Sequence, residues 1–200
     1  MNKAEFWNQT VFLALNARPG TAHWMLATAE AIANGLIYLI PIVLTVLWFW
    51  GDRRRRTITL KACIVAGLGL GAGQLIGLTW PHPRPFMIGL GHTWMPHAAD
   101  ASFPSDHLTV FAAVGLCMML DGEAVLGLAL LAAGLCVAWA RIFLGVHFPL
   151  DMLGAAGIAA MMYLLVTPIW QRLGGGASRL VELVYERAMA WPISRRWVRP

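Results

Sequence analysis

Two arginines, two histidines, two aspartates and a serine lie at the edges of long apolar segments. They fall in three short stretches: Pro-Arg-Pro-Phe at 83–86, Phe-Pro-Ser-Asp-His at 103–107, and Arg-Ile-Phe-Leu-Gly-Val-His-Phe-Pro-Leu-Asp at 141–151. Ionisable side chains beside the apolar core of a bilayer are costly and tend to be functional. Cations, acids and imidazoles together indicate a site that handles phosphate at a membrane surface.

Two of these stretches contain the expected starts of helices. Pro104 and Pro149 suit the first helical position, where the N–H that proline lacks has no partner. Asp106 and Asp151 are then each third in their helices, where the simpler interpretation is that they only compensate the helix dipole. The free N–H groups of two helix N-termini would also bind an anion.

The arginines of the first and third stretches strengthen the phosphate interpretation. The planar guanidinium fork of arginine matches the oxygens of phosphate, and Arg84 and Arg141 both lie close to an expected helix end. Either arginine alone could instead extend toward lipid headgroups. Convergence of both on one face with the helix N-termini favours a phosphate site.

The histidines have the spacing of an acid–base pair. His147 and Asp151 are four residues apart and share a helical face, so the carboxylate can bind one ring nitrogen and leave the other as a nucleophile or base. Next to Asp106, His107 is favoured in its protonated form, which can donate to a leaving oxygen. We expect one histidine to attack phosphorus and the other to protonate the departing group, rather than two satisfied core residues.

A metal site is the alternative use of the remaining histidines. His82, His92, His97 and Asp100 offer nitrogen and oxygen ligands, but no H-E-x-x-H or similarly tight pattern is present. They are better interpreted as loop or headgroup contacts. We therefore expect no metal and no cofactor.

The composition is that of an integral membrane protein. Of the 200 residues 58% are hydrophobic and 12% are charged, against about 25% charged in soluble domains. The net charge of +5 comes from arginine clusters at 53–56 and in the last thirty residues, not from a spread basic face. Such clusters are typical of cytoplasmic membrane edges, which argues against nucleic-acid binding.

Apolar runs predict an all-α, polytopic membrane helix bundle of about five spanning helices. The expected spans are 31–50 (with a kink at Pro41), 62–80, 104–120, 124–140 and 149–170. The run at 5–17 is too short to span and suits an interfacial or re-entrant helix, and 180–189 suits an amphipathic surface helix. We expect a membrane-embedded domain at 1–170 and a basic cytoplasmic tail at 171–200.

Arginine bias predicts the orientation. With residues 51–61 and the tail in the cytoplasm, the three motif stretches all face the other side of the membrane. The site is therefore predicted on the outer face of the membrane. The sequence indicates no oligomeric state.

The motifs resemble those of a known family. Arg84-Pro85, Pro104-Ser105-Asp106-His107, and Arg141 followed by His147 and Asp151 are similar to the three signatures of the type 2 phosphatidic acid phosphatase superfamily. The amino-acid sequence at 83–92 and 103–107 is closest to that of its bacterial undecaprenyl-diphosphate phosphatase branch. The resemblance covers about residues 80–170.

The resemblance implies a metal-independent phosphatase with defined roles. His147 would form a phosphohistidine, Asp151 would orient it, and His107 would protonate the leaving group. The implied phosphate ligands are Arg84, Ser105 and Arg141, with Asp106 in place of the usual glycine and His82 as a partial substitute for a missing cation. That cation is a lysine seven residues before Arg84, where this chain has Gly77, and the usual serine before Arg141 is Ala140.

The function so predicted is hydrolysis of undecaprenyl diphosphate, a polyprenyl diphosphate lipid, to undecaprenyl phosphate, which recycles the carrier of cell-wall synthesis. One alternative is a phosphotransferase that passes the phosphoryl group to lipid A. The other is a non-catalytic lipid-binding or transport protein of the same fold, for which the missing lysine and serine would speak. The intact set of His107, His147 and Asp151 argues against it.

Overall fold

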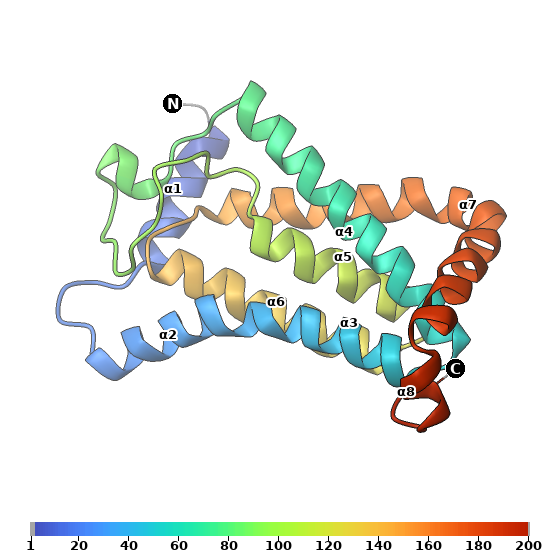
Figure 1. Cartoon of the computed structure of the whole chain (residues 1–200). Helices are drawn as coiled ribbons and strands as arrows, with labels where there is room; N and C mark the ends of the chain where they lie inside the picture. Colours follow the sequence, from blue (N-terminus) through green and yellow to red (C-terminus); the bar gives the residue numbers. More distant parts are fainter. Residues whose placement is uncertain (1–2, 200) are drawn as a thin grey trace.

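The apolar runs of the sequence form helices that pack side by side, and their connections gather at the two ends of the bundle (Figure 1). The structure is a computed structural model that describes residues 3–199, and in this range it contains helices and no strand. The elements are α1 (Lys3–Leu15), α2 (His23–Gly35), the 3-10 turn η1 (Leu36–Tyr38), α3 (Leu39–Trp50), α4 (Arg53–Thr79), η2 (Pro85–Ile88), α5 (Asp106–Asp121), α6 (Ala124–Phe143), α7 (Pro149–Ala188) and α8 (Ala190–Ser194).

Within residues 3–199, four helical segments are long and apolar enough to cross a membrane. They are His23–Trp50, α4, α6 and α7. This confirms the multi-pass helical membrane protein. The remaining expected span is α5, whose 16 residues reach about 24 Å, short of a hydrocarbon core of about 30 Å. It lies in the middle of the bundle against α4, α6 and α7, and most of its surface is buried.

The first two spans begin earlier than predicted. The first starts at His23 instead of Ala31, and its irregularity is η1, just before Pro41. Proline offers no N–H to the carbonyl one turn earlier and crowds it, so the backbone tightens there. The second starts at Arg53, because the Asp52 carboxylate accepts a hydrogen bond from the Arg55 N–H at 2.9 Å and caps the helix.

The last helix runs on where the sequence predicted an end near Trp170. α7 continues to Ala188 through Pro168 and changes direction on the way (Figure 1), so the expected domain division at 170/171 falls inside it. A proline inside a helix is a usual cause of such a bend. The end of the chain then folds back, and the carbonyl of Arg199 accepts hydrogen bonds from Arg56 (2.7 Å) and Tyr185 (2.8 Å).

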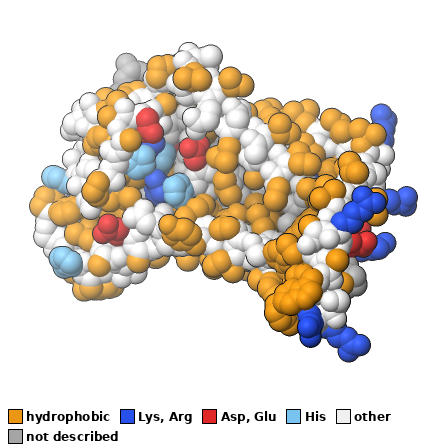
Figure 2. Space-filling model, in the orientation of Figure 1, with side chains coloured by type: hydrophobic (Ala, Val, Ile, Leu, Met, Phe, Trp, Pro, Cys, Tyr) orange, Lys and Arg blue, Asp and Glu red, His pale blue; other side chains and the backbone are white. Residues whose placement is uncertain are grey.

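The two ends of the bundle differ in character. At one end, α1 and the long segment between α4 and α5 cover the starts of α5 and α7; at the other lie α8 and the C-terminus (Figure 1). Figure 2 shows histidine, arginine and acidic side chains together in a hollow toward the first end. Lysine and arginine side chains gather at the second end, with a mostly hydrophobic belt between.

Candidate active site

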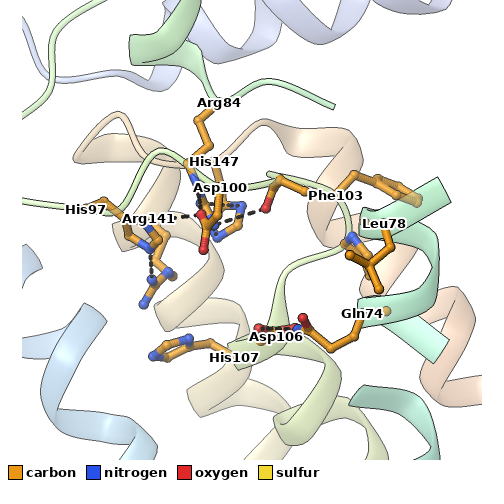
Figure 3. A pocket seen from close by; sticks show the side chains of 14 residues that line it. Gln74, Leu78, Arg84, His97, Asp100, Phe103, Asp106, His107, Arg141 and His147 are labelled. Atoms are coloured by element: carbon orange, nitrogen blue, oxygen red, sulfur yellow. Dashed lines mark hydrogen bonds and ion pairs between the residues drawn. The ribbon is translucent and has the colours of Figure 1, made fainter. Parts of the chain in front are cut away.

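The three motif stretches meet around one cavity of about 390 Å³ at the α1 end of the bundle (Figure 3). The segment between α4 and α5, the first turn of α5, the last turn of α6 and the α6–α7 connection each contribute side chains. The cavity is lined by Gly73, Gln74, Gly77, Leu78, Arg84, His97, Asp100, Ala101, Phe103, Pro104, Asp106, His107, Arg141 and His147.

His147 lies on the wall of this cavity and is almost fully buried. Its Nδ1 is 3.0 Å from Oδ2 of Asp151, one helical turn later. Its Nε2 is 3.1 Å from Nη1 of Arg84. The ring therefore has an acid on one nitrogen and a cation on the other.

These contacts determine which nitrogen carries the proton. Arginine only donates hydrogen bonds, so Nε2 of His147 must accept with its lone pair, and the proton resides on Nδ1 facing Asp151. Burial lowers the pKa of His147 to about 4, against the opposing hydrogen bond and charge of Asp151. The imidazole is thus neutral at physiological pH, with its free electron pair at the nitrogen nearest the arginine.

Asp151 is third in α7 behind Pro149, as predicted. Its Oδ2 accepts hydrogen bonds from the Phe148 N–H at 2.7 Å and from the Ser102 hydroxyl. Three donors on one oxygen fix the carboxylate against His147. Its other oxygen, Oδ1, is buried and has no partner.

Arg84 is held by the segment around it with its guanidinium at the cavity. Nη1 donates to the Val146 carbonyl at 2.9 Å, Nη2 to the Ala101 carbonyl at 3.2 Å, and Nε to Asp100 at 2.8 Å. Burial raises the pKa of Asp100, but the hydrogen bond and charge of Arg84 outweigh it, so the pKa is lowered and the pair is ionic. Asp100 itself is mostly exposed, which lets it give way to a phosphate.

Arg141 reaches the same cavity from the last turn of α6. Its Nη2 is 3.0 Å from Nε2 of His97, its Nη1 donates to the Ala33 carbonyl at 3.3 Å, and its buried Nε has no partner. Desolvation and the nearby arginines lower the pKa of His97, so this histidine is neutral and can accept from Arg141. Both arginines therefore present donors that an anion could use.

The start of α5 differs from the prediction by two residues. Ser105 is the N-cap with extended backbone, so Asp106, not Pro104, is the first helical residue. A serine in extended conformation is favoured at this position, and it places Pro104 before the helix. Asp106 lies at the cavity wall, 3.3 Å from Nε2 of Gln74, and His107 faces the cavity (Figure 3).

Two predicted phosphate ligands do not line the cavity. Ser105 is fully buried beside it, and its hydroxyl has no partner. His82 turns away: its Nε2 is 3.7 Å from Glu5 of α1, and its ring packs against Trp80 and Phe148. The expectation that His82 replaces the missing cation is therefore wrong in position. Gly77 does line the cavity, and in the described part of the chain Arg84 and Arg141 are the only lysine or arginine residues that line it.

Sequence reasoning missed Ser102. It is fully buried and lies between the acid and the imidazole: its hydroxyl donates to Asp151, and its oxygen is 3.4 Å from Nδ1 of His147. Its only sequence signal is its place directly before the Phe-Pro-Ser-Asp-His stretch. His97 and Asp100, considered as metal ligands, instead contact the two arginines. Within residues 3–199 no group of three or more His, Cys, Asp or Glu side chains is placed to hold a metal ion.

Known proteins share this arrangement of helices and motifs. The PAP2 superfamily model matches residues 57–174, more than half of the chain. The chain belongs to the PAP2 superfamily. The matched segment runs from α4 into α7 and contains all three motif stretches, while α1 to α3 lie outside it.

Two relatives, one of them matched over almost its full length, extend the PAP2 match. The Escherichia coli (strain K12) protein YbjG, whose name gives undecaprenyl-diphosphatase as a provisional activity, is 36% identical over 192 residues, 96% of this chain and 97% of its own. The undecaprenyl-diphosphatase BcrC of Bacillus subtilis (strain 168) is 38% identical over 131 residues, 66% of this chain and 67% of its own. Together with the superfamily, these relatives support a lipid phosphatase.

Solved structures agree in fold. The crystal structure of Aquifex aeolicus LpxE superimposes with a TM-score of 0.63 at 20% identity, over 80% of this chain and 93% of that one. A PAP2-type phosphatidylglycerolphosphate phosphatase from Bacillus subtilis gives 0.63 at 18% identity, over 86% and 88%. At this identity the likeness concerns the arrangement of helices alone.

Proposed function

We propose that this PAP2 protein hydrolyses undecaprenyl diphosphate to undecaprenyl phosphate and inorganic phosphate through a phosphohistidine on His147. The observation that carries the proposal is the geometry of His147: a buried neutral imidazole with Nδ1 on Asp151 and the Nε2 lone pair at a cavity with two arginines. The substrate is inferred from the named activities of YbjG and BcrC.

In the first step the terminal phosphate takes the place that Asp100 and His97 now hold on Arg84 and Arg141. The two guanidinium groups neutralise its oxygens and align phosphorus with Nε2. The Nε2 lone pair forms the N–P bond as the bond from phosphorus to the bridging oxygen breaks. Asp151 stabilises the positive charge that develops on the imidazole.

His107 is the proposed proton donor to the bridging oxygen, which leaves with undecaprenyl phosphate. Burial and the charge of Arg141 lower the pKa of His107 to about 4, so the expectation that Asp106 keeps it protonated is wrong, and the negative charge of the bound phosphate must restore its proton. In the second step His107 accepts a proton from water as the water oxygen attacks phosphorus, and the N–P bond breaks. Inorganic phosphate leaves, and His147 returns to its neutral form. Each proton that His107 gives in the first step is recovered in the second.

The proposed location is the outer face of a bacterial inner membrane. The cavity lies at the end of the bundle opposite the arginine-rich end (Figure 2). Because positive residues favour the cytoplasmic side, the cavity then opens toward the periplasm and the C-terminus lies inside.

Phosphate release from undecaprenyl diphosphate by detergent-purified protein in excess chelator tests the proposal. The wild type should release phosphate, and His147→Ala should lose at least about a thousand-fold in rate, as when a nucleophile is removed. His23→Ala, an exposed histidine at the start of α2, is the matched control and should keep full activity. Full activity in His147→Ala would sink the phosphohistidine, and loss on chelation alone would indicate a metal.

A further inference from the structure

A second, smaller cavity lies behind the catalytic pair, between α1 and the start of α7. It has a volume of about 170 Å³, and its lining includes Glu5, Asn8, Trp80, His82, Leu150 and Asp151. We call it the α1 cavity. Asp151 lines this cavity while His147 lines the catalytic one, and Phe103 is a wall of both.

Three polar atoms in the α1 cavity have unused hydrogen-bonding capacity. Asn8 Nδ2, His82 Nδ1 and Asp151 Oδ1 are buried without a partner, and they make up half of the six such side-chain atoms in the described part of the chain. Buried polar groups without partners are rare and costly, so their concentration in one cavity indicates a ligand. They comprise an amide donor, a carboxylate acceptor and a ring nitrogen that can act either way.

Water fits this set of groups. A buried water makes two to four hydrogen bonds and takes roughly 30 Å³, so the α1 cavity has room for more than one. The walls formed by Trp80, Phe103 and Leu150 are apolar, which strengthens hydrogen bonds inside. Within residues 3–199 these three polar atoms have no hydrogen-bond partner, one another included, so a bridging molecule would complete the network.

We propose that the α1 cavity holds water bound to Oδ1 of Asp151, with Asn8 and His82 as the residues that position it. The proposal rests on the proposed function, since it gives the second oxygen of the orienting carboxylate its hydrogen bonds. The ionisable groups facing Asp151 are His147 and, beyond it, Arg84 on the catalytic side, with His82 and Glu5 on the other. α1 thereby supports the catalytic pair from outside the segment that matches the PAP2 model.

The side chain of Asn8 is held in the orientation that this role requires. It is almost fully buried, and its Oδ1 accepts a hydrogen bond from the Leu150 N–H in the first turn of α7 at 3.0 Å. This contact aims Nδ2 into the cavity. Asn8→Asp keeps the acceptor for Leu150 and replaces only the inward amide by an oxygen that bears charge, so it is a nearly isosteric probe.

The first test measures thermal stability against pH for Asn8→Asp, wild type and Gln171→Glu, which makes the same amide-to-carboxylate change at an exposed site of α7 next to Arg172. Two carboxylates on one small cavity cannot both ionise cheaply, so the variant pair retains a proton. The group introduced thus has a raised folded pKa. The new carboxyl group destabilises the folded protein at pH 8, where it must be ionised. This destabilisation disappears as the pH falls through the raised pKa.

The expected result is a Tm deficit for Asn8→Asp at pH 8 that shrinks by at least half at pH 5.5, with no such change in Gln171→Glu. A deficit independent of pH, or no deficit, would overturn the water site. This readout needs no enzymatic activity, so it decides the α1 cavity even if wild type releases no phosphate and the proposed function fails.

The second test compares His82→Gln with His82→Phe in phosphate release. Glutamine can still hydrogen-bond water, whereas phenylalanine cannot. The expected kcat falls about ten-fold in His82→Phe and less than three-fold in His82→Gln, with KM unchanged in both. Equal losses in the two variants, or a loss only in KM, would contradict a positioning role.

Discussion

His147 is oriented by groups from three separate segments: Asp151 from α7, Ser102 and Arg84 from the α4–α5 connection, and its own connection between α6 and α7. Each contact restricts a different freedom of the ring. The acid selects the tautomer, the arginine marks the nitrogen that faces phosphate, and the serine holds the acid. At this scale the proposed catalytic pair, His147 and Asp151, depends on hydrogen bonds more than on packing.

Removal of the Ser102 hydroxyl tests its support of the acid. We expect Ser102→Ala to lower kcat about ten-fold, because a hydrogen bond to a charged group is lost, while KM changes less than about two-fold. Steady-state phosphate release measures both values. Ser194→Ala, an exposed serine of α8, is the control, and equal activity of the two variants would show that Ser102 plays no part.

The low pKa of His147 predicts an unusual pH dependence of the phosphorylation step. With a pKa of about 4 the nucleophile stays neutral as the pH falls from 7 to 5, and it is lost only below that range. The rate of phosphoenzyme formation in rapid-quench experiments should therefore not fall between pH 7 and pH 5, whereas an ordinary histidine nucleophile of pKa about 6.5 would lose about 25-fold. A titration midpoint near pH 6.5 would contradict the geometry.

The residues predictable from sequence were those whose partners lie within one helical turn. His147 and Asp151 are four apart, and this spacing sufficed to predict their contact. Ser102 and Asp151 are 49 residues apart, and no local pattern indicates that they meet. His82 precedes Arg84 by two, yet its Nε2 lies 3.7 Å from Glu5 of α1, a residue 77 positions earlier that no local pattern places beside it.

At the scale of elements, the site is carried by the α5–α6 pair, since α5 bears His107 and α6 bears Arg141. The pair packs closely because Gly127 of α6 contacts the backbone of α5: a Cβ there would lie 2.5 Å from the Cα of Met119. Backbone cannot move aside as a side chain can. Close helix approach at small residues is a common basis of association in membranes.

Substitution of this glycine should loosen the pair. We expect Gly127→Ala to lower the stability by about 1–3 kcal/mol, the usual cost of overpacking, and to reduce activity through His107 and Arg141. Gly157→Ala in α7 is the control, because a Cβ there meets nothing within 4 Å. Thermal unfolding in detergent measures both, and equal Tm values would contradict the packing account.

The apolar runs predicted which segments form helices, but they did not predict where each helix begins and ends. Arg53 to Arg56 look like a loop by charge, yet they begin α4 because Asp52 caps it and because Arg55 pairs with Glu123 and Arg53 with Glu182. These partners are distant in sequence. α7 likewise passes through Pro168, which a local rule treats as a break.

For the whole molecule, the separation of the cavity from the basic end predicts its orientation. In a background without the three native cysteines, Ala99→Cys beside the cavity should react with a membrane-impermeant maleimide in intact spheroplasts. Ala190→Cys in α8 should react only after lysis; both positions are exposed. The reverse pattern would place the site in the cytoplasm.

The most direct test of the central claim is to trap the phosphoenzyme. Purified protein is mixed with undecaprenyl diphosphate radiolabelled in its terminal phosphate, in excess chelator, quenched within milliseconds, and digested for peptide mapping. The account predicts an acid-labile, alkali-stable label on the peptide that contains His147, absent in His147→Ala. Rapid phosphate release with no protein-bound label, or a label that persists in His147→Ala, would contradict it.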